Sequence, residues 1–366
     1  MADYSRIMVF GGTGVTGGLI AELLAEHVGA AVVIAGRNGA AVQEKADALA
    51  GKLPQRQFSA RVVDIYDRQA LVAALADVDL LVIAAPVAAH MAAIGAAALE
   101  SGTDLIDILV VSEVARALEP LADTAREKGR IIVTQAGFHP GVPGPMIRKA
   151  AKLVANAHSV HVGMAMRAQL RDARSASEIT ESVAAPTYLL RDGVWTEASY
   201  TDLRPFGFGS PFGTKSCYPL DMPEAKTVGL ELGLANAGVY AAGFNWFVDY
   251  LVFPLLTVAM KLGGLAWARR VTPLFYWGNI WFSPKPSCIE MRAVAEGSGA
   301  NGPETKSFCL YSDDPYGLTA HCVLAAVRQM RDGPLAAPGL HSMGAEIEPE
   351  RLFADLEALG ARTWTE

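Results

Sequence analysis

A cluster of glycines directly after a short apolar strand is the feature of this sequence that most constrains its fold. Residues 6–10 (RIMVF) are almost entirely apolar, and residues 11–17 follow as Gly-Gly-Thr-Gly-Val-Thr-Gly. Apolar residues at helical spacing continue from there to Leu24. A strand that ends in a glycine-rich turn and leads into a helix is typical of the first βαβ unit of a dinucleotide-binding sheet.

The same alternation of apolar runs and helical segments continues through the N-terminal part of the chain. The further apolar runs lie at residues 31–35, 59–63, 79–84, 105–108 and 130–134. Strands that are apolar on both faces and separated by helices form a parallel sheet that is covered on both sides. We therefore predict an α/β fold, with a Rossmann-type doubly wound parallel sheet over residues 1–145.

The glycine cluster suits the binding of a diphosphate. Glycines allow a tight turn and a close approach of backbone to ligand, and the helix that begins there offers unpaired N–H groups. The alternative is that the cluster is only a turn. The predicted cofactor contacts in this loop are Gly11, Gly12, Thr13, Gly14, Val15, Thr16 and Gly17.

The residue after the second strand distinguishes NADP from NAD. Proteins built for NAD place an acidic residue about 20 positions past the glycines, where it binds the ribose 2′-hydroxyl. Here Arg37 occupies that region, and the next carboxylate is Glu44. Because a guanidinium can hold a 2′-phosphate with paired hydrogen bonds, the sequence predicts NADP(H) as cofactor. The alternative is that Arg37 only ends a strand in solvent.

Further cofactor contacts are expected where other parallel strands end, since ligands bind outside the carboxyl ends of such strands. Asp64 and Ile65 are expected at the adenine edge, and Ala85 and Pro86 near the ribose and nicotinamide half. The predicted set beyond the glycine loop and Arg37 is Asp64, Ile65, Ala85, Pro86, His90, Gly137 and Phe138.

These motifs resemble those of the saccharopine dehydrogenase-like reductases. The resemblance rests on residues 11–17 with Arg37, on Ala85-Pro86, on residues 137–144 (GFHPGVPG), on residues 191–195 (RDGVW) and on Pro338-Gly339-Leu340. It implies NADP-linked hydride transfer, as in reductases of imines formed from amino acids or polyamines. The sequence is also similar to the trans-acting enoyl reductases of lipid biosynthesis.

The resemblance also implies a domain organisation. A mixed α+β substrate and dimerisation domain is expected at residues 146–314, with the helices of residues 315–366 packed back on the nucleotide domain. One departure concerns the segment after the fifth strand. Family members often continue from its aspartate to a Gly-Glu pair, whereas here Asp107 precedes the aliphatic residues 108–111. This departure favours a less polar substrate.

The candidates for a proton donor or a substrate contact are few. His139 is expected at the nicotinamide end, and an ordinary pKa near 6.5 suits proton exchange, although it could simply pack in the turn. His90 is a second candidate, with helix capping as the alternative. Lys215 and Tyr218 form a polar cluster that could contact a substrate or be a solvated loop. No spacing of His, Cys, Asp or Glu predicts a metal site.

The sequence therefore predicts an NADPH-dependent oxidoreductase that transfers a hydride to a C=O or C=N group of a fairly apolar small molecule. Three alternatives stay open: an enoyl (C=C) reductase of lipid or polyketide metabolism, a redox-neutral isomerase or epimerase with bound NADP, and a sensor or scaffold that holds NADP without turnover.

The net charge and the cysteines indicate which binding partners and which cellular compartment to expect. A net charge of −7 argues against nucleic-acid binding through a basic surface. The four cysteines lack metal or redox spacing, and no signal peptide is evident, so we expect a cytoplasmic protein. We also expect it to be a homodimer.

Residues 232–260 contain one charged residue, Asp249. We interpret this segment as a buried helix pair that lines a pocket or a dimer interface, in preference to peripheral membrane contact through residues 232–270. A membrane span is a third alternative.

Overall fold

The computed structural model describes residues 4–170, 176–177, 179–180, 186–199, 201–242, 244–299 and 302–366. The chain divides into two compact units. One unit is formed by Met1–Val142 and Tyr316–Leu359, and the other by Pro143–Pro315 and Gly360–Glu366.

The first unit is built on a seven-stranded sheet in which every neighbouring pair is parallel. Its order is β15-β6-β5-β4-β1-β2-β3, so the strand order reverses between β1 and β4. The strands are β1 (Arg6–Phe10), β2 (Ala31–Gly36), β3 (Phe58–Val62), β4 (Leu80–Ile83), β5 (Asp104–Asp107), β6 (Ile131–Thr134) and β15 (Gly339–Ser342). The predicted doubly wound sheet is confirmed, and the tail adds a seventh strand that the sequence analysis did not predict.

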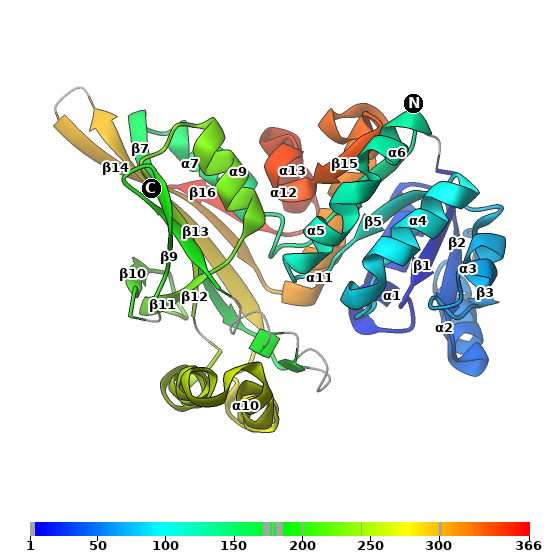
Figure 1. Ribbon diagram of the computed structural model, residues 1–366, viewed down its shortest axis with the longest axis horizontal. Helices are drawn as coiled ribbons and strands as arrows, with labels where there is room; N and C mark the ends of the chain where they lie inside the picture. Colours follow the sequence, from blue (N-terminus) through cyan, green and yellow to red (C-terminus); the bar gives the residue numbers. More distant parts are fainter. Residues whose placement is uncertain are drawn as a thin grey trace. The chain divides into compact units, whose positions relative to one another are not determined.

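Helices connect these strands (Figure 1). They are α1 (Val15–His27), α2 (Gly39–Lys52), α3 (Arg68–Leu75), α4 (Met91–Ser101), α5 (Glu113–Leu118) and α6 (Ala122–Glu127), followed in the tail by α11 (Pro315–Asp332), α12 (Met343–Glu346) and α13 (Pro349–Ala358). Successive residues of β1 are buried on alternate faces of the sheet. Helices on both faces therefore explain why strands such as β2 and β4 are apolar throughout.

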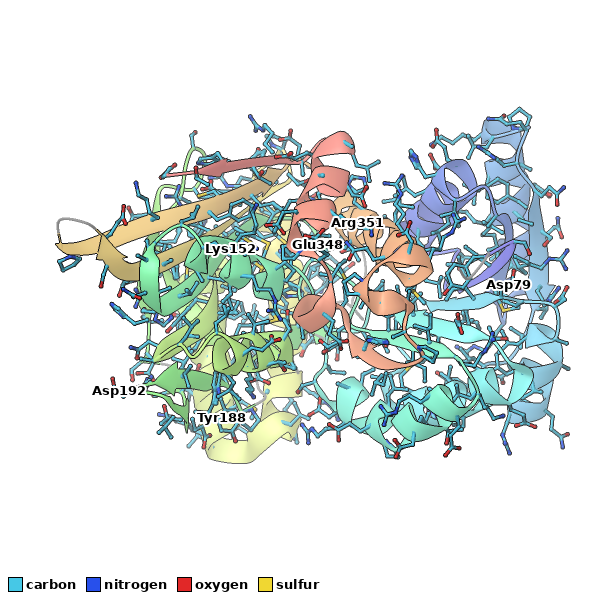
Figure 2. All side chains as sticks on the ribbon, turned by 90° about the horizontal axis from the view of Figure 1, so that it is seen from above. Asp79, Lys152, Tyr188, Asp192, Glu348 and Arg351 are labelled. Atoms are coloured by element: carbon cyan, nitrogen blue, oxygen red, sulfur yellow. The ribbon has the colours of Figure 1, made fainter. Side chains whose placement is uncertain are left out.

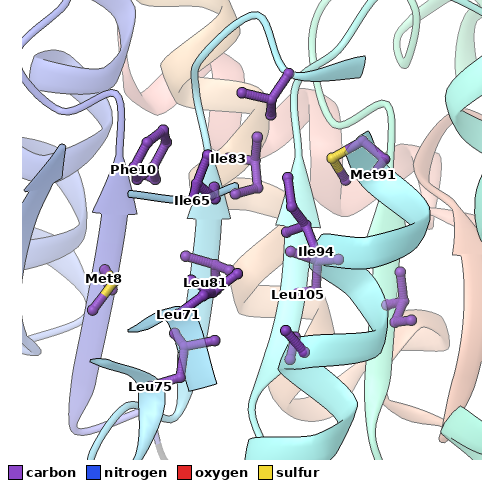
Figure 3. Close-up of a cluster of buried hydrophobic side chains, with 14 of the residues drawn as sticks. Met8, Phe10, Ile65, Leu71, Leu75, Leu81, Ile83, Met91, Ile94 and Leu105 are labelled. Carbon is purple, nitrogen blue, oxygen red and sulfur yellow. The ribbon is translucent and has the colours of Figure 1, made fainter. Parts of the chain in front are cut away.

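One face of the sheet forms a large apolar core with α3 and α4 (Figure 3). The labelled side chains are Met8 and Phe10 of β1, Leu81 and Ile83 of β4, Leu105 of β5, Ile65 after β3, Leu71 and Leu75 of α3, and Met91 and Ile94 of α4. All of them are at most 6% exposed. Removal of this apolar surface from water is the main stabilising contribution in such a core.

The tail helices α11 and α13 are fastened to each other by polar contacts. The carboxylate of Glu348 caps α13 by accepting hydrogen bonds from the backbone N–H groups of Glu350 and Arg351, at 3.0 and 2.8 Å. The Arg351 guanidinium in turn donates to Asp332 at the end of α11, at 2.6 Å. Glu348 and Arg351 are labelled in Figure 2.

The second unit is built on a mixed sheet of nine strands. The path is β10-β11-β12-β7-β13-β14-β16, and β8 and β9 attach beside β12. The strands are β7 (Ala155–Arg167), β8 (Tyr188–Arg191), β9 (Val194–Glu197), β10 (Arg204–Gly207), β11 (Thr214–Leu220), β12 (Asn236–Ala242), β13 (Cys288–Gly299), β14 (Gly302–Ser312) and β16 (Arg362–Thr365). Of the pairs, β12 with β7 is parallel and the others are antiparallel. With α7 (Pro143–Ala151) and α9 (Pro223–Glu231), the unit is mixed α+β, as predicted.

An Asp-Gly pair between two short apolar runs predicts a β-hairpin, and the structure contains this hairpin at Asp192-Gly193. Both residues have positive φ, 49° and 79°, which matches the two-residue turn that suits the twist of antiparallel strands. Figure 2 labels Asp192 in this turn and Tyr188 at the start of β8.

Two local expectations differ from the structure. Residues 296–304 are polar and glycine-rich, which is typical of a loop, but the ladder between β13 and β14 continues from Glu296 opposite Thr305 to Gly299 opposite Gly302. Residues 315–366 were expected to form helices that pack back on the nucleotide unit. The last strand of this segment, β16, instead pairs with β14 in the second sheet, because that strand offers a free edge for its backbone groups.

The apolar stretch forms a helix pair, residues 246–282, between β12 and β13. A π-helical turn (Val248–Val252) leads into α10 (Phe253–Phe282), which is broken at Gly263 and Gly264 into two arms. Figure 1 shows the two arms side by side. The predicted helix pair is confirmed. Its outer face carries many exposed apolar side chains in this single chain, so a pocket lining does not account for that face, and the expected dimer interface stays a prediction.

Candidate dinucleotide-binding site

The loop after β1 holds its shape through backbone contacts that leave no room for side chains. A Cβ atom on Gly11 would overlap the carbonyl oxygen of Ala84 at the end of β4, and Gly11 has a φ of +89°. A Cβ on Gly17 would overlap the carbonyl oxygen of Gly11. The loop, the end of β4 and the first turn of α1 are therefore in direct backbone contact, as the close packing of a pyrophosphate-binding turn requires.

The first turn of α1 can accept an anion. Gly14 is the N-cap residue, its backbone is extended, no side chain caps the helix, and its first turn contains no acidic residue. The N–H groups of a first helical turn have no intrahelical acceptor, and the helix dipole adds partial positive charge. Thr13 and Gly14 are exposed, and Val15 and Thr16 are partly exposed. The loop therefore fits the diphosphate of a dinucleotide.

Arg37 belongs to an exposed cluster at the ends of β2, β3 and β4. Its guanidinium lies over the ring of Tyr66, 5.6 Å from the ring centroid. The Tyr66 ring lies 4.4 Å from that of His90, centroid to centroid. Tyr66 is 47% exposed, so its ring is accessible beside both groups. The structure thus brings together Arg37 and His90, and adds Tyr66, which the sequence analysis did not select. The sequence feature that could have pointed to Tyr66 is its position as an aromatic residue two positions after Asp64, at the end of a strand.

The remaining residues at the ends of β3 and β4 have different surroundings. Asp64 is exposed, and its carboxylate accepts a hydrogen bond from the N–H of Tyr66 at 3.1 Å. The side chain of Ile65 lies in the apolar core, so only its backbone can face a cofactor. Ala85 is partly buried, and Pro86 is exposed.

A buried polar cluster at the ends of β5 and β6 was not predicted as part of the site. Asp107 Oδ1 accepts hydrogen bonds from the N–H groups of Leu109 and Gln135, at 3.0 and 3.2 Å. Within the described part of the chain, both amide atoms of Gln135 are buried without a hydrogen-bond partner, and the Asp107 carboxyl interacts with the Thr134 hydroxyl. Gln135 also has a φ of 61°, an uncommon conformation for a residue other than glycine. Unpaired buried polar atoms at the edge where ligands bind mark this cluster as part of the site.

Burial shifts the pKa values of two groups near this edge, Asp107 and His139, in opposite directions. It raises the pKa of Asp107 to about 6, because the ionised carboxylate is removed from water. It lowers the pKa of His139 to about 4, because the imidazolium loses its hydration. His139 is half-buried, and its ring lies 5.1 Å from that of Phe138. His139 is therefore neutral at pH 7, and the ordinary pKa on which its predicted proton-donor role rested is wrong.

The structure places the other predicted contacts as follows. Gly137 donates its N–H to the carbonyl of Pro140 at 3.2 Å, within the tight turn that precedes the second unit. Lys215 and Tyr218 belong to the second unit and lie three positions apart on β11, so their side chains point to opposite faces of the strand. Tyr218 packs against Phe253, with ring centroids 5.9 Å apart. The second sheet therefore does not bring Lys215 and Tyr218 together.

The first unit also matches a known family of sequences. Residues 7–133 match the model of the saccharopine dehydrogenase NADP binding domain. This part of the chain is therefore similar to the NADP-binding domain of the saccharopine dehydrogenases. The chain is thus an NAD(P)-dependent oxidoreductase, and NADP is the cofactor that fits the family domain.

Similarity to one solved structure supports the fold. The chain is similar to a saccharopine dehydrogenase (L-Glu forming) from Saccharomyces cerevisiae, with a TM-score of 0.67 and 15% identity over 98% of this chain and 100% of that chain. It is also similar to GenD2 from gentamicin A biosynthesis, in complex with NAD, with a TM-score of 0.45 and 14% identity over 100% of this chain and 97% of that chain. Among curated proteins, no sequence matches the chain. Among the described residues, no group of three or more His, Cys, Asp or Glu side chains could hold a metal ion.

The tight contact at Gly17 predicts a loss of cofactor binding in Gly17→Ala. The added Cβ would overlap the Gly11 carbonyl, so the loop or the helix must move. Displacement of a binding group by about 1 Å can reduce activity on the order of 100-fold. We therefore expect the NADPH dissociation constant of Gly17→Ala to rise by about that factor. Fluorescence titration with NADPH measures it. Gly51→Ala is the matched control, because a Cβ added at Gly51 would meet no atom within 4 Å and the affinity should not change. Equal affinities in the two variants would contradict the prediction.

The raised pKa of Asp107 predicts an unusual pH dependence of stability. A carboxyl whose pKa is higher in the folded than in the unfolded state stabilises the fold at low pH, and this contribution is lost as pH rises through the folded value, here about 6. Asp107→Asn keeps an oxygen acceptor and removes the charge. Relative to wild type, its free energy of unfolding should increase by roughly 3 kcal/mol between pH 4 and pH 8.

Urea unfolding across that pH range measures this difference. Asp77→Asn is the control, since hydrogen bonds from Arg61 hold the pKa of Asp77 to about 2, below the tested range. The difference between Asp77→Asn and wild type should stay flat from pH 4 to pH 8. A flat profile for Asp107→Asn as well would contradict the assignment of a raised pKa.

Proposed function

We propose that the protein uses NADPH to reduce a C=O or C=N group of a fairly apolar small molecule. The observation that carries the proposal is the segment directly after Asp107. Ile108, Val110 and Val111 are partly exposed aliphatic residues at the carboxyl end of β5, beside the cluster of Asp107, Thr134 and Gln135. An aliphatic lining with a few polar groups is the usual character of a site for a small apolar ligand.

The glycine loop and Arg37 supply the cofactor part of the proposal. We assign the diphosphate to the first turn of α1 and the 2′-phosphate to Arg37, whose guanidinium is exposed over Tyr66. When bound, NADPH supplies the hydride, and the protein contributes orientation and exclusion of water. A neutral His139 can offer a hydrogen bond to the acceptor at pH 7, but it carries no proton to release from a cationic form.

An acceptor panel tests the proposed reaction. The full chain is mixed with NADPH and with ketones, cyclic imines and enoyl compounds, each in an apolar and a polar version, and absorbance of the reduced nicotinamide is followed. We expect oxidation with apolar ketones or imines, and weaker activity with their polar counterparts, because the aliphatic segment gives a polar group no partner.

Each other outcome replaces the proposal. Activity confined to the enoyl compounds, with saturated products, would identify an enoyl reductase. Turnover of a substrate to its isomer with the nicotinamide unchanged would identify an isomerase with bound NADP. NADPH binding without oxidation by any acceptor would favour a sensor.

The assignment of Arg37 predicts a selective loss of NADPH affinity. Arg37→Ala removes a charge-assisted hydrogen bond, worth about 1.5–3 kcal/mol, so the NADPH dissociation constant should rise roughly 10- to 100-fold. The dissociation constant for NADH should not change, since NADH lacks the 2′-phosphate. Arg37→Lys keeps the charge but not the paired hydrogen bonds, so its NADPH dissociation constant should lie between those of wild type and Arg37→Ala. Equal loss for both cofactors would show that Arg37 acts through the fold instead.

A further inference from the structure

We propose that the helix pair, residues 246–282, docks the protein on the surface of a membrane that contains anionic lipids. The inference is independent of the proposed reaction and concerns the second unit alone. The proposed contact is shallow and interfacial: apolar side chains of the helix pair enter the headgroup layer, and its basic side chains contact lipid phosphates.

The outer face of the helix pair is apolar and exposed. Its exposed large apolar side chains are Trp246, Tyr250, Leu251, Leu255, Val258, Leu262, Leu265, Trp267, Leu274, Trp277, Trp281 and Phe282. Their exposed fractions range from 37% at Leu265 to 74% at Tyr250. Only 28% of the most apolar window in Val248–Phe282 is buried. A patch of this size on a chain surface marks a site of contact with another apolar phase.

The exposed residues follow one face of each arm. Leu251, Leu255, Val258 and Leu262 are spaced by four, three and four positions, so they lie on one side of the first arm. Trp277 and Trp281, four positions apart, lie on one side of the second arm with ring centroids 5.5 Å apart. The opposite faces are buried in a separate cluster that includes Val252, Leu256, Ala268 and Phe275. Packing of that inner face holds the outer face in place.

The charge of the helix pair is opposite in sign to that of the chain. Lys261, Arg269 and Arg270 are exposed, whereas the one acidic residue, Asp249, is buried. The helix pair therefore carries +2 (3 − 1), while the whole chain carries −7. Basic residues close to a membrane surface are attracted to anionic lipids by about 1 kcal/mol each at physiological ionic strength. In a symmetric dimer through this face the same basic residues would approach each other, which disfavours a second copy as the occupant.

The break between the arms limits how deeply the pair can insert. By length and composition Val248–Phe282 is the one described helix that could cross a membrane. Gly264 has φ 62° and ψ −158°, so the helix does not continue through it. The arms, residues 248–262 and 265–282, are about 22 and 27 Å long at 1.5 Å per residue, shorter than a hydrocarbon core of about 30 Å.

Both arms also join the same end of the second sheet. The chain leaves β12 at Ala242, opposite Ala165 of β7, and enters β13 at Cys288, opposite Arg167 of β7. The helix pair therefore returns to the side from which it departs. This geometry excludes a single membrane span, and the short arms favour an interfacial contact over a hairpin that crosses the bilayer twice.

Vesicle binding by the full chain tests the proposal directly. The probes are vesicles of phosphatidylcholine alone and of phosphatidylcholine with phosphatidylglycerol, and co-sedimentation gives the partition coefficient. We expect binding on the order of 10- to 100-fold stronger to the anionic vesicles, with the preference lost at high salt. Four of the six tryptophans, Trp246, Trp267, Trp277 and Trp281, lie in the helix pair, so tryptophan emission should shift to shorter wavelength on binding.

Matched variants locate the contact. Leu262→Glu, at a residue that is 70% exposed, should reduce binding at least tenfold, and Leu230→Glu, at a residue that is 62% exposed on α9, should not. A double charge reversal, Arg269→Glu with Arg270→Glu, should remove the preference for anionic vesicles and leave circular dichroism unchanged. It keeps the proposal testable if Leu262→Glu does not fold.

Three results would overturn the proposal. The first is equal loss of vesicle binding in Leu262→Glu and Leu230→Glu, or no binding by wild type to either vesicle. The second is vesicle binding that neither high salt nor alkaline carbonate releases, which would identify a membrane span. The third is a dimer in solution that Leu262→Glu dissociates, with no affinity for vesicles, which would make this face an interface between two copies.

Discussion

Backbone contact at the point where the strand order reverses is the constraint on which the nucleotide unit depends. Gly11 lies against the end of β4, and Gly17 lies against Gly11, so strand, loop and helix meet without intervening side chains. This contact positions the uncapped first turn of α1 at the carboxyl edge of the sheet. The ends of β2, β3 and β4 then bring Arg37, Tyr66 and His90 together at the same edge. The loop and this cluster thus lie at the one edge of the sheet where we propose that the diphosphate and the 2′-phosphate bind.

Strand β5 contains two buried carboxylates, Asp104 and Asp107, whose surroundings differ. Asp104 accepts hydrogen bonds from the Tyr4 hydroxyl and from the N–H of Ile131, each at 2.9 Å, and serves the packing of the sheet. Asp107 lies three positions later, at the carboxyl end, beside the Thr134 hydroxyl and the amide of Gln135, which is unpaired among the described residues. Burial without full pairing is costly in a purely structural position. The carboxylate at the start of β5 therefore supports the sheet, whereas the one at its end lies at the edge where we propose that a ligand binds.

The sequence predicted the features that depend on local spacing. The glycine turn, the six parallel strands and the Asp192-Gly193 hairpin each follow from a few adjacent residues, and the structure contains all of them. The cluster at Asp107 and Gln135 was not predictable, because it depends on the left-handed backbone of Gln135 and on burial from several directions. The pKa of His139 was misjudged for the same reason, since burial is a tertiary property. Apolar spacing predicted the helix pair but could not tell which face is covered, because exposed and buried faces are both apolar here.

The edge strand β15 links completion of the first sheet to the end of synthesis. It pairs with β6, yet Gly339 follows Thr134 by 205 positions (339 − 134). At about 5–20 residues per second a ribosome needs roughly 10–40 s to make that stretch. Until then the newly made nucleotide unit presents β6 as an open edge, with unpaired backbone groups that can pair with another chain. Cells that make this protein therefore have to protect a nascent sheet edge for most of the time that the second unit takes to emerge.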